Sequence, residues 1–205
     1  MELSPAQHDA LVELLNIGFG RAGASLSSLT GYRVLLEVPR VAIHPIDRLN
    51  DTLGEYMQGE VPSVHQAFGG PVGGDAMLLL DAVAATTLKE LLTNEPALPL
   101  SLDASAREML TEVGNILLNA CLGTFGNLLK VAVSFSVPDI DIASVRAVVD
   151  RLIGPSHSFR YALVVTARFR LRDAEVTGYV VIVLTVQSLT RLLVAVEQWE
   201  RDQTQ

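Results

Sequence analysis

The sequence has a single cysteine, and this scarcity excludes several kinds of site. Cys121 has no second thiol, so the chain cannot form an internal disulfide framework, and it lacks the companions that a metal site needs. The four histidines lie far apart without the spacing of a zinc site or a catalytic triad: they are His8, His44, His65 and His157. We therefore predict no metal centre and place Cys121 on the buried side of a helix.

Positive charge is also scarce. The 205 residues include 15 Lys and Arg against 23 Asp and Glu, which gives a net charge of −8 at pH 7. A chain of this sign repels the phosphate backbone of nucleic acid, so we exclude nucleic acid as a partner. Hydrophobic residues make up 49% and charged residues only 19% of the chain, a balance that argues against disorder.

Long apolar runs are missing as well. The longest aliphatic stretch, GYVVIVLTV at 178–186, is too short to span a bilayer, and its β-branched residues predict a buried strand. The N-terminal MELSPAQHDA has no basic segment followed by an apolar core, so it does not resemble a signal peptide. We expect a cytoplasmic protein without membrane insertion.

The first half of the chain predicts a helix, an extended segment, a hairpin and a second helix. Ser4 as N-cap, Pro5 at the first helical position and Gln7 as a capping-box partner begin a helix that runs to about residue 29, with a bend near Gly18 to Gly20. The remaining predicted elements are an extended segment over 32–43, a short helix or loop over 46–54, strands over 61–68 and 75–81, and a helix over 82–92.

After a proline-containing connector over 93–104, the same order returns. A long helix over 103–129 precedes an extended segment over 130–142, a short helix near 143–152, strands over 158–171 and 175–186, and a last helix over 188–200. We therefore expect an internal duplication within a single domain, residues 1–205, whose repeats cover approximately 4–95 and 103–203.

Identical residues recur at one offset between these halves. At a spacing of 99 residues the matched pairs are Glu13 with Glu112, Asn16 with Asn115, and Pro39 with Pro138. Asp9 falls opposite Glu108, which is also acidic. At 100° per residue, Asp9, Glu13 and Asn16 lie within about 60° of one another on one helix face. The apolar residues around them differ between the halves, so a retained polar face indicates a surface with a function.

These spacings resemble the signature of the CheC family of chemotaxis phosphatases, which includes CheC, CheX and FliY. That signature is Asp or Ser, three residues, Glu, two residues, Asn, twenty-two residues and Pro. The chain carries it twice, as Asp9, Glu13, Asn16 and Pro39 and again as Glu108, Glu112, Asn115 and Pro138. It departs from the family where NIGAGNA appears as NIGFGRA, with Arg21 in place of Asn, and where the second copy, NILLNAC, has no glycine.

The resemblance implies an α+β fold of the CheC type, in which two pseudo-symmetric halves each present a long exposed helix over a mostly antiparallel sheet. It also implies an activity, hydrolysis of the aspartyl phosphate on a CheY-like response regulator. Such a regulator would be the partner and would supply its own Mg²⁺ and lysine, so the chain would need no cofactor.

The catalytic residues implied by this resemblance are Glu13, Asn16, Glu112 and Asn115. A helper of this reaction must place water in line with phosphorus, and the carbonyl oxygen of an Asn side chain can accept a hydrogen from that water. We therefore expect both asparagine amides to lack strong partners within the chain. Glu13 and Glu112, one turn earlier, can pair with the regulator's lysine.

Neighbouring positions have supporting roles in this hypothesis. Asp9, Gly20, Glu108 and Asn119 extend the two stripes and would contact the partner, and Pro39 and Pro138 are structural because proline ends strand pairing. Gly20 occupies the position that Asn119 occupies in the second half, so the two sites should differ in activity.

A second hypothesis keeps the fold without the chemistry. The chain would then be a non-catalytic adaptor or switch-type module that binds a response regulator or CheD. The intact Glu and Asn in both halves favour the enzyme, because a scaffold has no need of the amide.

Overall fold

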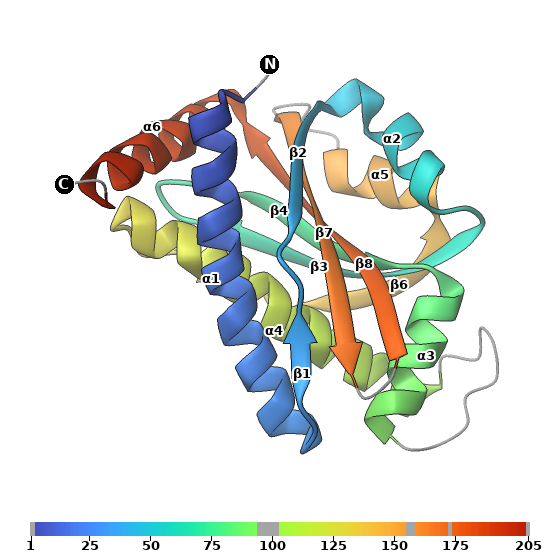
Figure 1. Cartoon of the computed structure of the whole chain (residues 1–205). Helices are drawn as coiled ribbons and strands as arrows, with labels where there is room; N and C mark the ends of the chain where they lie inside the picture. The colour runs from blue at the N-terminus through green and yellow to red at the C-terminus, as the bar shows by residue number, and fades with distance from the viewer. Residues whose placement is uncertain (1–2, 94–102, 155–158, 172–173, 204–205) are drawn as a thin grey trace.

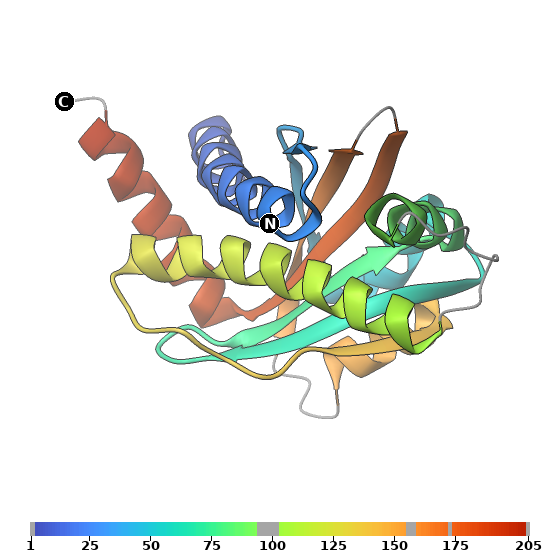
Figure 2. The same ribbon diagram turned by 90° about the horizontal axis from the view of Figure 1, so that it is seen from below.

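One curled, eight-stranded antiparallel sheet carries helices on both faces in the computed structural model, which describes residues 3–93, 103–154, 159–171 and 174–203. Four helices, α1, α3, α4 and α6, cover one face and enclose the larger hydrophobic core. Helices α2 and α5 cover the other face and enclose a smaller core (Figures 1 and 2). The expected α+β class and mostly antiparallel sheet are confirmed.

The elements follow the predicted order in both halves. The first half contains α1 (Pro5–Thr30), β1 (Val34–Leu36), β2 (Arg40–Pro45), the short helix η1 (Ile46–Arg48), α2 (Leu49–Tyr56), β3 (Glu60–Gly69), β4 (Gly74–Leu80) and α3 (Ala82–Thr93). The second half contains α4 (Ala104–Leu129), β5 (Ser134–Phe135), β6 (Asp139–Ser144), α5 (Val145–Ile153), β7 (Phe159–Leu171), β8 (Ala174–Thr185) and α6 (Val186–Gln203). Most of the expected connector, residues 94–102, lies outside the described residues.

The strands of the two halves pair in equivalent ways. The strand order is β1-β7-β8-β4-β3-β5, with β2 also on β7 and β6 also on β3, so that exchanging the halves maps the sheet onto itself. The registers agree too: Arg40 faces Thr166, and Asp139, which is 99 residues after Arg40, faces His65. Thr166 and His65 are therefore equivalent positions. We propose that this symmetry reflects duplication of one ancestral half.

Helix α1 begins as the sequence predicts. The Ser4 hydroxyl accepts from the Gln7 backbone N–H at 3.1 Å, and the Gln7 side chain accepts from the Ser4 N–H at 2.9 Å, which completes a capping box. The helix continues without a break through Gly18 and Gly20. Gly18 instead serves packing, because a Cβ there would lie 3.0 Å from the Ala120 carbonyl oxygen of α4.

Helix α4 lies directly on the sheet. Its N-cap is Asp103, whose carboxylate accepts from the Ala106 N–H at 2.8 Å and lies 2.8 Å from the Lys89 ammonium. The Lys89 ammonium and the Ala106 N–H lower the pKa of Asp103. Further along, a Cβ at Gly114 would lie 2.5 Å from the Val64 side chain of β3. This close approach brings Asn115, the next residue of α4, to the sheet.

The single cysteine is buried in the main core, as predicted. Burial raises the pKa of the Cys121 thiol to about 12, so the thiol stays protonated and unreactive at neutral pH.

His65 on β3 should make stability depend on pH. Its Nε2 lies 2.8 Å from Asp75 and its Nδ1 3.3 Å from Asp139, and the hydrogen bond to Asp75 is the main cause of its raised pKa. A raised pKa stabilises the folded state fully below the unfolded value of about 6.5, and this stabilisation is lost as pH rises through the folded value.

We expect the free energy of unfolding of the unmutated protein to fall from this source as pH rises above about 6.5. Urea unfolding at several pH values measures it, with His65→Gln as the comparison. Identical pH dependence in the parent and His65→Gln would contradict the assignment.

Candidate functional site

The predicted stripe of α1 lies on the exposed side of the helix. Asp9, Glu13 and Gly20 are exposed and Asn16 is half-buried. The other side of α1, including Leu11, is buried in the main core. Burial of the apolar side therefore presents the polar residues outward, as the periodicity predicts.

Helix α1 runs alongside the β1–β2 edge of its own half (Figure 1). Asp9 lines a pocket with the β2 segment 41–43, and about three turns beyond Asn16 the Ser27 hydroxyl accepts from the Val34 N–H of β1 at 2.9 Å. Asn16 lies between these two contacts, so it lies beside the connection over 37–39. Pro39 is buried in this connection, between β1 and β2, in agreement with a structural role.

The second stripe, on α4, has the same exposure pattern as the first, except that Asn119 is half-buried whereas Gly20 is exposed. Glu108 and Glu112 are exposed, and Asn115 and Asn119 are half-buried. The connection between β5 and β6, which contains Pro138, runs back along α4 (Figure 2). In this half, however, hydrogen bonds join the helix to the strand and the connection.

These hydrogen bonds hold the amide of Asn115. Its Oδ1 accepts from the Asn119 Nδ2 at 2.7 Å and from the Gln66 Nε2 of β3 at 3.4 Å. Gln66 also donates to the Ser136 carbonyl oxygen at 3.0 Å. Because that carbonyl can only accept, it fixes which end of the Gln66 amide is the donor, and this in turn makes the Asn115 oxygen the acceptor.

The first half lacks both partners. Gly20 replaces Asn119, and the strand register makes Ala167 the equivalent of Gln66. Neither Gly nor Ala offers a side-chain donor. Accordingly, the side chain of Asn16 has no hydrogen bond within the described part of the chain.

The expectation of two free amides is therefore met at Asn16 and wrong at Asn115. The physical reason is that the Asn115 oxygen, the atom that would accept from water, already accepts two hydrogen bonds within the chain. The Nδ2 group of Asn115 can only donate hydrogen bonds, so it cannot accept one from water. The two sites thus present different chemical groups to a partner.

The carboxylates of the stripes remain available for a cation. Across residues 3–93 and 103–154, neither Glu13 nor Glu112 has an ion-pair partner, whereas Asp9 lies 3.3 Å from the ring nitrogen of His8. Glu108 and Glu112 also line a pocket of about 630 Å³ between α4, α3 and the end of α1. These positions suit a basic side chain supplied by a partner.

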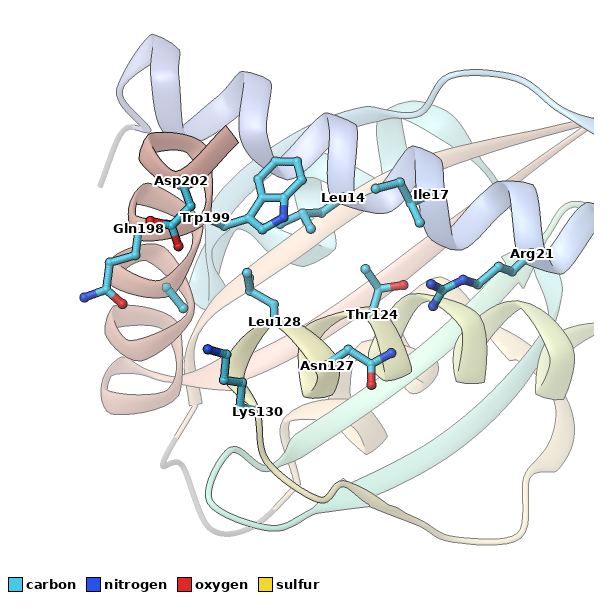
Figure 3. A pocket seen from close by; sticks show the side chains of 11 residues that line it. Leu14, Ile17, Arg21, Thr124, Asn127, Leu128, Lys130, Gln198, Trp199 and Asp202 are labelled. Carbon is cyan, nitrogen blue, oxygen red and sulfur yellow. The ribbon is translucent and has the colours of Figure 1, made fainter. Parts of the chain in front are cut away.

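A pocket that the sequence did not predict lies on the other flank of α1. It has a volume of about 310 Å³ and lies where α1, α4 and α6 meet (Figure 3). Arg21, Lys130 and the indole of Trp199 line it together with apolar side chains such as Leu14. Three helices distant in sequence contribute these residues, so no local motif could have identified the pocket.

The described residues contain no group of three or more His, Cys, Asp or Glu residues arranged to hold a metal ion. None of their helices is long and apolar enough to cross a membrane.

Comparison with known proteins finds similar chains among CheC and FliY proteins. No family model matches the chain. The CheY-P phosphatase CheC of Bacillus subtilis (strain 168) is 26% identical over 197 residues, which cover 92% of this chain and 93% of CheC. The structure of Thermotoga maritima FliY superposes with a TM-score of 0.77 at 18% identity, over 97% of this chain and 99% of that one. The chain is thus similar to members of the CheC, CheX and FliY family.

Two more solved structures share the CheC-type fold. A chain of the FliG–FliM complex from H. pylori has a TM-score of 0.68 at 11% identity and covers 93% of this chain and 99% of its own. A chain of the CheX–CheY–BeF3–Mg²⁺ complex from Borrelia burgdorferi has a TM-score of 0.50 at 18% identity, over 82% and 96%.

The difference between the two amides is measurable without any partner. We expect the side-chain NH₂ of Asn119 to exchange with solvent more slowly than that of Asn16, because only Asn119 donates within the chain. Side-chain amide exchange followed by ¹H–¹⁵N NMR measures this, and Asn115→Ala should remove the protection of Asn119. Equal exchange of Asn16 and Asn119 in the parent would contradict the hydrogen-bond pattern.

Proposed function

We propose that this protein accelerates hydrolysis of the aspartyl phosphate on a CheY-like response regulator, with Asn16 as the main water-orienting residue. The observation that carries the proposal is an uncommitted Asn16 amide on the same exposed helix face as an unpaired Glu13. Likeness to CheC, named as a CheY-P phosphatase, supports the reaction. The likeness to a CheX–CheY complex supports the partner.

In this reaction the chain mainly has to position a water molecule. The Asn16 oxygen accepts one hydrogen of a water molecule and aims the water oxygen at phosphorus, in line with the bond to the aspartyl oxygen. As the new P–O bond forms, the bond to the aspartyl oxygen breaks, which releases inorganic phosphate and restores the aspartate carboxylate. No covalent intermediate on this chain is needed. An amide suits this position because a carboxylate would be repelled by the phosphoryl oxygens.

Glu13 anchors the helix in this proposal. Its carboxylate, one turn before Asn16, pairs with the lysine of the regulator and so sets the distance between the amide and the phosphoryl group. The Mg²⁺ that balances phosphoryl charge would come with the regulator. Asp9 and Gly20 extend the contact, and the absence of a side chain at Gly20 leaves the space beside Asn16 open.

The second site is weaker in this proposal. Asn115 can orient water only after its oxygen is released from Asn119 and Gln66, and breaking hydrogen bonds of this kind costs on the order of 1 kcal/mol each. Glu112 remains available to bind a lysine. The second half therefore serves mainly as a docking surface, with Glu108 and Asn119 at its margins.

One specific observation also supports a second function. A chain of the FliG–FliM complex from H. pylori shares this fold over 93% of the present chain, and the Asn115 oxygen already accepts hydrogen bonds within the chain. A binding module that engages a response regulator or CheD without hydrolysis would have these properties. It would bind a phosphorylated regulator and leave its lifetime unchanged.

Asn→Ala variants separate these functions. We expect Asn16→Ala to remove most of the accelerated loss of phosphate from the regulator, roughly 30- to 1000-fold or 2 to 4 kcal/mol in the barrier, and Asn115→Ala to remove much less. Phosphate release from candidate phosphorylated regulators measures this, with the exposed Asn50→Ala of α2 as control. Regulator binding should survive in both variants, and full activity in the double variant would rule out the mechanism.

Removing the restraint on Asn115 should strengthen the second site. In an Asn16→Ala background, we expect the further change Asn119→Ala to raise the residual rate several-fold, because the shorter of the two hydrogen bonds to the Asn115 oxygen is gone. The same phosphate-release assay measures it. The triple variant that also carries Asn115→Ala is the control and should stay inactive; a gain there would show that Asn119 acts by another route.

A further inference from the structure

Two valines project from equivalent connections into solvent. Val38 is 65% exposed and Val137 is 88% exposed, and each directly precedes a signature proline. A single exposed valine is ordinary on a protein surface. Here, however, the same apolar residue is exposed at equivalent positions of the two halves, 99 residues apart.

The backbone holds both connections in the same way. The Glu37 N–H donates to the Arg168 carbonyl oxygen at 3.0 Å, and the Ser136 N–H donates to the Ala67 carbonyl oxygen at 2.9 Å. Residues 37 and 136 immediately precede the two valines. Both side chains are therefore presented from anchored backbone rather than from a freely moving loop.

Each valine adjoins one of the candidate asparagines. In the second half, the Ser136 carbonyl oxygen accepts from the Gln66 amide, which also donates to Asn115. Val137 is the residue directly after Ser136. In the first half, Val38 lies in the connection that flanks Asn16. A partner that covers either asparagine would meet the neighbouring valine as well.

The acidic side chains beside the valines are already paired within the chain, whereas the exposed Arg40 has no ion-pair partner among the described residues. Glu37 binds Arg170 at 2.6 Å and lies 3.7 Å from Arg168, and Asp139 pairs with Arg151 and His65. The carboxylates of Glu37 and Asp139 thus have partners within the chain. Contact with a partner beside these two residues would bury apolar surface without leaving their charges unpaired.

The fold itself does not require an apolar side chain at these positions. A β-branched residue favours the extended backbone that precedes proline, and Thr shares this preference with Val. In the first half the buried residue of the connection is Pro39, whereas Val38 remains outside. The extended backbone before proline therefore explains why these two residues are β-branched. It does not explain why they are apolar.

We propose that Val38 and Val137 are the apolar docking contacts for a CheY-like regulator, one beside each asparagine. Each valine packs on an apolar side chain of the regulator next to its phosphorylated aspartate, while the adjacent Glu takes the lysine. This inference rests on the proposed function. It adds a requirement for the partner, namely an apolar side chain beside its phosphorylation site.

Val→Thr tests the inference because it keeps the shape and the β-branch and removes the apolar contact. In an Asn115→Ala background, where the first site acts alone, we expect Val38→Thr to raise KM for the phosphorylated regulator about 3- to 10-fold with kcat within two-fold. Val38→Ile should preserve KM. Val83→Thr on α3, at a position that is 75% exposed and distant from both stripes in sequence, is the matched control and should match the background protein.

Binding gives a second readout that does not require turnover. Affinity for the regulator carrying BeF3, a stable analogue of its phosphoryl group, should fall at the first site in Val38→Thr, at the second site in Val137→Thr, and at both sites in the double variant. Unchanged affinity and KM, with an active parent protein, would overturn the inference and leave the proposed function standing. If the parent neither binds nor dephosphorylates any regulator, the proposed function fails and the docking inference falls with it.

Discussion

The crossing of α1 over α4 at Gly18 fixes where both polar stripes can lie. With no Cβ at Gly18, the helix backbones approach so closely that an added methyl group would lie 3.0 Å from the Ala120 carbonyl oxygen and 3.1 Å from the Thr124 hydroxyl oxygen. The buried faces of both helices are used in this crossing and in the sheet contact below it. The faces that carry Glu13 and Glu112 are consequently directed to solvent.

The common framework supports two different sites. Equivalent strands, edge connections and helices place Asn16 and Asn115 in matching positions, and two side chains then separate their chemistry. Asn119 and Gln66 restrain one amide, whereas Gly20 and Ala167 leave the other free. The restraint has a cost, because the Gln66 Oε1 and the Asn119 Oδ1 are buried without a protein donor. A chain optimised only for stability would not keep this arrangement.

The sequence predicted local features well because local signals determine them. The capping box at Ser4, the buried strand β8 and the buried Cys121 each follow from a few adjacent residues. The polar stripe likewise follows from helical periodicity. Gln66 could not be found in this way, because its contact with Asn115 depends on the packing of α4 against β3, across 49 positions of sequence. The packing role of Gly18 could not be predicted for the same reason, because only the position of α4 shows the close approach at this residue.

The mutual strand pairing also governs how the chain can fold. Each half donates its first two strands to the hairpin of the other: β1 and β2 complete the edge at β7, and β5 and β6 complete the edge at β3. A nascent first half on the ribosome therefore holds β3 and β4 with both outer edges unpaired, and neither edge can close until the second half emerges. Folding must await nearly the whole chain, and the unprotected hairpin makes the interval before completion the period of greatest aggregation risk.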